Sequence, residues 1–194
     1  MALLYSLSGF LMKLSDDVYD KNSNKLIACI LGVFCGIAIA YLASNNIDAA
    51  YIFIGILIAT GISFKIDGIH HIITLLVFLS LFIIWGIFNT DILANFSLIT
   101  LFICTVSGFI DEIGNDNPFI YKKSRFFKVF FDYRFSMKIA IFILALLGLY
   151  QSFTGFTLPL VDFLSFQTFI FFILFEFFYE LADIIFDKYF LYLE

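Results

Sequence analysis

Long apolar runs separated by short polar turns dominate the chain. Six of them approach the roughly 20 residues that a membrane-spanning helix needs, namely 26–42, 49–64, 69–88, 92–110, 139–153 and 158–178. A shorter run, 2–14, lacks the basic start and the cleavage site of a signal peptide, so it predicts a short or tilted first helix. The pattern predicts an all-α, polytopic integral membrane protein with about seven transmembrane helices, or six if the first run does not span.

The composition supports this interpretation. Hydrophobic residues make up 62% of the 194 residues, with 29 phenylalanines and two prolines, which is more apolar surface than a soluble domain of this length could enclose. We therefore expect residues 1–194 to form a single membrane domain in contact with membrane lipids. The three cysteines lie in apolar runs without a C-x-x-C pair, so their pattern supports neither a disulfide nor a zinc site. The pI near 4.9 argues against a nucleic-acid partner.

The basic residues predict the orientation. If all seven runs span, every Lys and Arg falls after the first, third, fifth or seventh helix, and the other turns contain none. Because cytoplasmic loops are enriched in basic residues, this distribution predicts a multi-pass protein of the cell membrane with its N-terminus outside and its C-terminus in the cytoplasm.

Four acidic clusters fall on the predicted cytoplasmic side. They are Asp16, Asp17 and Asp20; Asp67; Asp111, Glu112 and Asp116; and Glu180, Asp183 and Asp187. Together with Glu176, the last cluster advances by four, three and four residues and shares one helix face. Like charges on one face repel, and a carboxylate inside a span costs about 2.5 to 3.5 kcal/mol. A bound cation or a water-filled cavity would relieve both costs. The simpler interpretation is that the acidic residues are helix ends exposed to water.

The chain contains one internal similarity. Ser8–Asp17 matches Ser107–Asp116 at four of ten positions. This indicates either a parallel repeat with halves 1–98 and 99–194 or chance in a biased composition.

The polar segment 111–134 predicts a cytoplasmic loop with an interfacial helix. Wound as a helix from Ser124, it separates basic residues from phenylalanines, as in helices that lie in the membrane surface. Its basic residues, among them Lys122, Lys123 and Arg125, could contact anionic head groups or a lipid-linked phosphate, or could serve only as an anchor.

The Asp-Asp-x-x-Asp pattern of Asp16, Asp17 and Asp20 predicts a metal site. Several carboxylate oxygens on one helix edge suit Mg²⁺ (or Mn²⁺), which completes its coordination with waters and substrate phosphates. At a membrane surface, such a site suits a substrate with an apolar tail and a phosphate or diphosphate head.

The segment from Asp16 to Lys25 resembles the aspartate-rich segment of the polyprenyl-phosphate N-acetylhexosamine-1-phosphate transferases. Two helices later, Lys65-Ile-Asp67-Gly68-Ile69-His70-His71 is similar to that family's N-x-x-D-G-x-D-G segment, with Phe64, His70 and His71 replacing the asparagine, the second aspartate and the second glycine. The resemblance covers about the first 90 residues. It implies a cytoplasmic, Mg²⁺-dependent site in which Asp16 and Asp17 are the paired aspartates, Asp67 is the D-G aspartate and Lys25 follows in the basic turn.

A second resemblance points to related chemistry. Asp16-Asp17-x-x-Asp20-x-x-x-Asn24 is similar to the N-D-x-x-D-x-x-x-D motif of intramembrane aromatic prenyltransferases. Asp183-Ile-Ile-Phe-Asp187 has the D-x-x-x-D form of that family's second motif, which implies Asp183 as a further metal ligand. Both resemblances imply an isoprenoid phosphate substrate.

His70 and His71 follow Asp67 at the start of a predicted helix. A histidine there could donate a proton or bind the metal, although paired histidines also occur as plain interfacial residues. We therefore expect a Mg²⁺-dependent enzyme acting on a polyprenyl phosphate or diphosphate, with Asp17, Asp67 and His70 as catalytic candidates. A cation transporter lined by acidic residues and a non-catalytic membrane scaffold are the alternatives, and the oligomeric state is left open.

Overall fold

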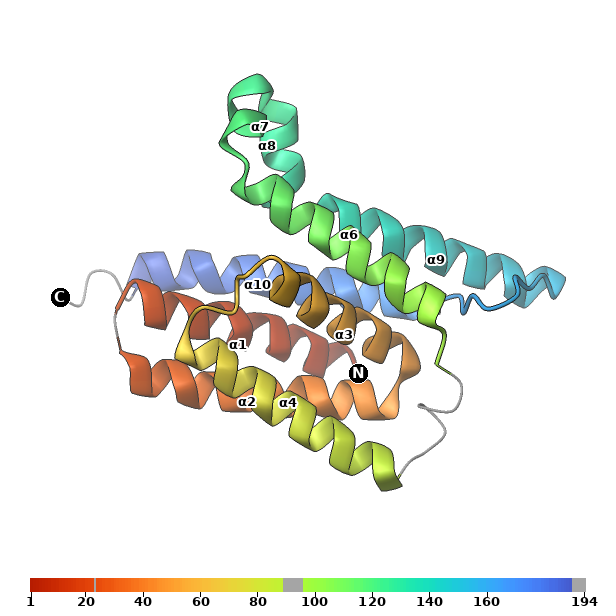
Figure 1. Ribbon diagram of the computed structural model, residues 1–194, viewed down its shortest axis with the longest axis horizontal. Helices are drawn as coiled ribbons and strands as arrows, with labels where there is room; N and C mark the ends of the chain where they lie inside the picture. The colour runs from red at the N-terminus through yellow and green to blue at the C-terminus, as the bar shows by residue number, and fades with distance from the viewer. Residues whose placement is uncertain (23, 89–95, 190–194) are drawn as a thin grey trace. The chain divides into compact units, whose positions relative to one another are not determined.

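The computed structural model describes residues 1–22, 24–88 and 96–189, apart from the side chains of 88 and 121–123. Every regular element in this part of the chain is a helix, which confirms the all-α prediction (Figure 1). The helices are α1 (Ala2–Asp20), α2 (Lys25–Asn45), α3 (Ile47–Ile62), α4 (Ile69–Phe88), α6 (Leu98–Asp116), α7 (Pro118–Lys123), α8 (Arg125–Asp132), α9 (Phe135–Thr154) and α10 (Phe166–Tyr189).

Within the described residues, four helices are long and apolar enough to cross a membrane. They are Lys25–Asn45, Ile69–Ile87, Leu98–Asp116 and Phe135–Thr154, and the 16-residue α3 is also apolar. These helices support the prediction of a membrane protein.

Several helix boundaries differ from those that the sequence pattern predicts, and two of the differences have a clear local cause. The last helix starts at Phe166 instead of 158, because Gly155 ends α9 in a left-handed conformation and Pro159 follows within a short non-helical segment. The Ser165 hydroxyl oxygen accepts a hydrogen bond from the Thr168 backbone N–H (3.2 Å) and so caps the later start. The Asp48 carboxylate supports this cap by accepting from the Ser165 backbone N–H (2.9 Å) and the Thr168 hydroxyl (2.7 Å). At the other boundary, α6 continues to Asp116, so the segment 111–134 begins inside a helix.

The chain divides into two compact units that interleave along the sequence. The first comprises Met1–Ile47, Ile66–Ala94 and Ile170–Glu194, and the second comprises Asp48–Lys65 and Asn95–Phe169. The first unit therefore holds α1, α2, α4 and most of α10.

Close helix contacts fix the geometry of the first unit, in which α2 packs against both α1 and α4 (Figure 1). Gly32 and Gly36 form a G-x-x-x-G pair on α2, and a Cβ on either would stand within 3.0 Å of α4 atoms, including the Thr74 side chain and backbone. The Ser15 hydroxyl of α1 donates to the Ala28 carbonyl of α2 at 2.8 Å. These contacts hold the C-terminal end of α1 beside the first turn of α4.

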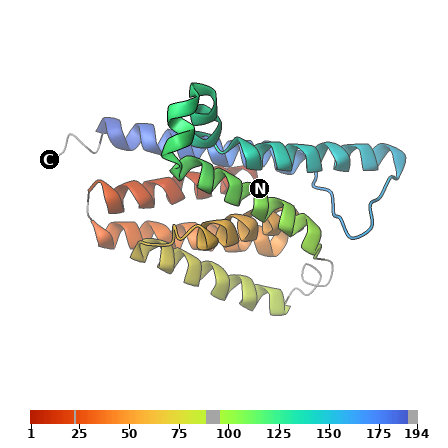
Figure 2. The ribbon, with the colours of Figure 1, turned by 45° about the horizontal axis from the view of Figure 1, so that its top comes forward.

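In the second unit, α6 packs against α9 and α8 (Figure 2). The Asp111 carboxylate accepts hydrogen bonds from the backbone N–H groups of Ser136 (3.0 Å) and Met137 (2.8 Å), which are otherwise unpaired in the first turn of α9. These two hydrogen bonds explain Asp111 as a helix cap.

Phe131 of α8 covers Gly114 of α6, so part of the apolar face predicted for the interfacial helix packs against protein.

Candidate metal centre

The C-terminal end of α1 and the first turn of α4 bring three potential metal ligands together. Asp16 Oδ1 lies 3.5 Å from His70 Nε2 and 3.2 Å from His71 Nε2. One ligand atom from each residue lies within 4.8 Å of the other two. The sequence pattern had associated the two histidines with Asp67, whereas the structure pairs both of them with Asp16.

His70 is the most enclosed member of this group. Its side chain is 2% exposed, and neither ring nitrogen makes a hydrogen bond within the described residues. The ring lies between those of Tyr19 and His71, at centroid distances of 4.3 and 3.9 Å. A Cβ on Gly68 would stand 2.4 Å from His70 Cε1, so the absence of a side chain at Gly68 leaves room for the imidazole.

Asp16 carries the negative charge of the centre. Burial by itself would raise the pKa of this carboxyl, but the hydrogen bond with His71 and the charges of His71 and Lys13 outweigh it and hold the pKa below its ordinary value. Asp16 is therefore ionised at neutral pH and is able to bind a cation.

The second aspartate of the pair has a different environment. Asp17 is 2% exposed, and its Oδ1 lies 3.0 Å from Lys13 Nζ and 3.1 Å from Lys21 Nζ. Lys21 also donates to Asp183 (2.9 Å) and Asp187 (2.8 Å) of α10, and Lys13 lies 3.2 Å from Asp183. We call these five residues the α1–α10 ion-pair network. A metal ion at Oδ1 of Asp17 or Asp183 would have to displace an ammonium group, whereas Asp17 Oδ2 is buried without a hydrogen bond in the described part of the chain.

The remaining predicted site residues lie outside these contacts. Asp20 and Asp67 are exposed and form no ion pair within the described residues. Lys25 is exposed, with its Nζ 6.0 Å from the centroid of the Tyr19 ring, which in turn stacks on His70. Arg125 is exposed at the start of α8, and the side chains of Lys122 and Lys123 lie outside the described residues.

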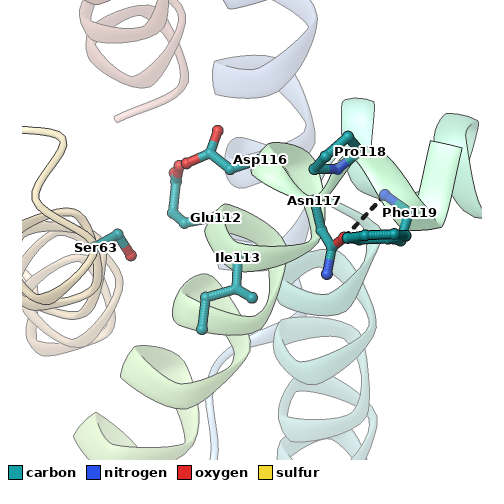
Figure 3. A pocket seen from close by; sticks show the side chains of 7 residues that line it. All are labelled: Ser63, Glu112, Ile113, Asp116, Asn117, Pro118 and Phe119. Atoms are coloured by element: carbon teal, nitrogen blue, oxygen red, sulfur yellow. Dashed lines mark hydrogen bonds between the residues drawn. The ribbon is translucent and has the colours of Figure 1, made fainter.

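Glu112 and Asp116, the other two acidic residues at the end of α6, line a pocket in the second unit. The cavity has a volume of ≈ 390 Å³ and is lined by Ser63, Glu112, Ile113, Asp116, Asn117, Pro118 and Phe119 (Figure 3). Lys65 Nζ lies 2.7 Å from Glu112 and 3.0 Å from Asp116, and Arg134 lies 3.5 Å from Glu112. Basic side chains of the protein thus compensate both carboxylates.

Sequence reasoning missed two contributors to the centre. Lys13 was grouped with other basic residues as an orientation signal, although its spacing of three and four residues from Asp16 and Asp17 predicts ion pairs on one helix face. The G-x-x-x-G pair at Gly32 and Gly36 was also visible, and it indicates the close helix packing that positions α4.

Comparisons with protein-family profiles, curated proteins and solved structures found no match to this chain.

Proposed function

We propose that the chain is a metal-dependent membrane enzyme that acts on the phosphate or diphosphate head of a polyprenyl lipid at the cytoplasmic membrane surface. The observation that carries this proposal is the convergence of Asp16, His70 and His71 at the ends of two helices. A carboxylate and two imidazoles within reach of one another are ligand types that metal sites in proteins use.

The surroundings of this centre suit an anionic lipid head. Lys25 is exposed and follows the acidic end of α1, where its ammonium group could pair with a phosphate that also contacts the metal. Apolar side chains of α2 and α4, such as Leu26 and Ile69, are exposed beside the same helix ends and could contact the first isoprene units. The resemblances to polyprenyl-phosphate transferases and aromatic prenyltransferases point to the same substrate class.

The proposal includes the number of membrane spans, their orientation and the internal repeat. We propose seven spans, with α1, α3 and α10 crossing beside the four longer apolar helices, the N-terminus outside and the C-terminus in the cytoplasm. The distribution of basic residues supports this topology. The similarity between Ser8–Asp17 and Ser107–Asp116 supports a parallel repeat, since Gly9 and Gly108 both stand at close helix contacts.

Substrate binding and turnover test the function. The full-length protein, purified through a tag without histidine and placed in phosphatidylcholine nanodiscs, is incubated with a polyprenyl phosphate or diphosphate and with Mg²⁺, Mn²⁺ or Zn²⁺. We expect metal-dependent lipid binding and conversion of the lipid head, followed by mass spectrometry. Asp16→Asn should abolish both, and Asp20→Asn, an exposed carboxylate outside the cluster, should retain both. Metal-independent binding, or an active Asp16→Asn protein, would contradict the proposal.

Cation transport is the second candidate. Glu176, which is 5% exposed on α10, favours it because a buried carboxylate in an apolar helix often marks an ion path. Lys21 weakens this candidate, since it already compensates Asp183 and Asp187 of the same acidic face. Metal-driven uptake into proteoliposomes without any reaction of the lipid would favour transport.

A further inference from the structure

We propose that Asp16, His70 and His71 bind a nitrogen-preferring transition metal, with Zn²⁺ as the reference ion, in place of the Mg²⁺ that the aspartate pattern predicts. This inference rests on the proposed function for the role of the metal, but its evidence is the set of donor atoms alone. Two of the three donors are imidazole nitrogens, which suit Zn²⁺, Fe²⁺, Ni²⁺ and Cu²⁺, whereas Mg²⁺ selects oxygen ligands.

The distances between the donors fit such an ion. Ligands at about 2.0 to 2.1 Å from a tetrahedral zinc ion stand about 3.3 Å from one another. Asp16 Oδ1 lies 3.5 and 3.2 Å from the two Nε2 atoms, close to that separation. One ligand atom from each of the three residues lies within 4.8 Å of the other two, so a small rotation of the rings would complete the triangle. Three protein ligands leave a fourth position for water or a phosphate oxygen, as in catalytic zinc sites.

The environment of His70 is a second observation that indicates a bound ligand. A buried polar group without a hydrogen bond costs free energy, and such groups are rare in folded proteins. His70 is 2% exposed, and both its nitrogens lack hydrogen bonds in the described structure, although Nε2 faces Asp16. Coordination of a metal through Nε2 would satisfy this nitrogen and give the buried ring a function.

A site built of oxygen ligands alone would have to compete with lysine side chains for two of the predicted carboxylates. Asp17 and Asp183 are held by Lys13 and Lys21, and their Oδ1 atoms lie between 2.9 and 3.2 Å from ammonium groups. At the cluster itself, a Mg²⁺ ion would therefore find one carboxylate, Asp16, which lies 3.9 Å from Lys13 Nζ and has two imidazoles beside it. That donor set does not fit the near-octahedral oxygen shell that Mg²⁺ demands.

Metal titration tests this assignment. The full-length protein, purified through a tag without histidine, is stripped with chelator in phosphatidylcholine nanodiscs and titrated with Zn²⁺, Co²⁺, Mn²⁺ and Mg²⁺. We expect one Zn²⁺ per chain, bound at least about 100-fold more tightly than Mg²⁺. Co²⁺ should give a visible absorption spectrum typical of nitrogen ligands.

Variants assign the ligands. His71→Ala is the first test, because this ring is 31% exposed and its removal leaves the buried packing of His70 in place. We expect His71→Ala and Asp16→Asn each to weaken Zn²⁺ binding at least about tenfold, while Asp20→Asn keeps the wild-type affinity. Far-ultraviolet circular dichroism and thermal melting confirm that each variant is folded.

The outcomes separate this inference from the proposed function. Equal affinity for Mg²⁺ and Zn²⁺, or unchanged Zn²⁺ binding in both ligand variants, would overturn the metal assignment. Metal-dependent lipid conversion with Mg²⁺ alone would keep the function and discard the transition metal. Tight Zn²⁺ binding through the three residues, without any effect of polyprenyl phosphate or diphosphate, would keep the metal site and discard the substrate.

Discussion

Gly68 controls the position of the His70 ring. A methyl group at this position would stand 2.4 Å from Cε1 and 2.5 Å from Nδ1 of His70, and the ring is confined by Tyr19 and His71. We therefore expect Gly68→Ala to move the imidazole and to weaken Zn²⁺ binding by about 10- to 100-fold, the range for a changed support of a metal ligand.

Zinc titration of the folded variant checks this prediction. Ile69→Ala is the control, because Ile69 is half exposed and adjacent in sequence but is not part of the cluster. Wild-type zinc affinity in Gly68→Ala would contradict this prediction. It would mean that the His70 ring can shift without loss of coordination, so that Gly68 is not needed to position it.

At the residue level, the sequence predicted part of the candidate centre. Asp16 and His70 were both proposed as site residues from motif spacing. Their partnership was not predictable, because it depends on how deeply α1 and α4 approach each other across Gly32 of α2. The role of Asp17 also depends on the fold, since Lys21 pairs with it from the C-cap of α1 and joins it to Asp183 of α10.

At the element level, the α1–α10 ion-pair network joins two helices that are far apart in the sequence. Burial disfavours the charge on Lys21, but its hydrogen bonds with Asp187 and Asp183 raise the pKa above 10.5. Burial also opposes the charge on Asp183, but Lys21 and Lys13 outweigh it and lower the pKa below 3.8. The pair of Lys21 and Asp183 therefore stabilises the fold above the ordinary pKa of Asp183 and below that of Lys21, whereas burial raises the pKa of Asp17 in the same network.

The pH dependence of Lys21→Gln tests this coupling. The stabilisation by Lys21 should be lost as the pH falls through the lowered pKa of Asp183 or rises through the raised pKa of Lys21. We expect Lys21→Gln to lower the melting temperature by a constant amount between about pH 5 and pH 10, and by less at either extreme. Lys188→Gln, which removes an exposed lysine of α10, is the control. A pH-independent difference would indicate that Lys21 stabilises the fold by packing on Phe186.

The apolar runs predicted which segments are helical better than they predicted where each helix begins and ends. Each of the seven apolar runs contains or overlaps a helix, because a long apolar segment in a membrane must satisfy its backbone internally. The start of α10 was misjudged because Phe163 and Leu164 extend the apolar run backwards across the capping residue Ser165, which Asp48 of α3 supports from a distant part of the sequence. The serine cap was a local signal, but the support from Asp48 could not be seen in the local sequence.

At the scale of the whole molecule, the seven-span topology can be tested at α2, whose two ends are predicted to lie on opposite sides of the membrane. Lys25 follows an odd-numbered span and is assigned to the cytoplasm, whereas Asn45 follows an even-numbered span and is assigned to the outside. Ser44 is buried, so the exposed neighbour Asn45 is the better labelling site. In a background where Cys29 is replaced by serine, and Cys35 and Cys104 are buried, a cysteine introduced at Asn45 should be the main reactive thiol on the outer side.

Labelling of intact cells with a membrane-impermeant thiol reagent tests this topology. We expect Asn45→Cys to react in intact cells and Arg125→Cys, on the exposed face of α8, to react only after permeabilisation, since basic residues mark the cytoplasmic side. An epitope fused before Met1 should be detected from outside if α1 spans, and from inside if only six helices do. Reaction of both cysteines from the same side would contradict the seven-span order. It would also remove the argument that the metal centre opens toward the cytoplasm, because Asp16 and Lys25 are assigned to that side by the same alternation.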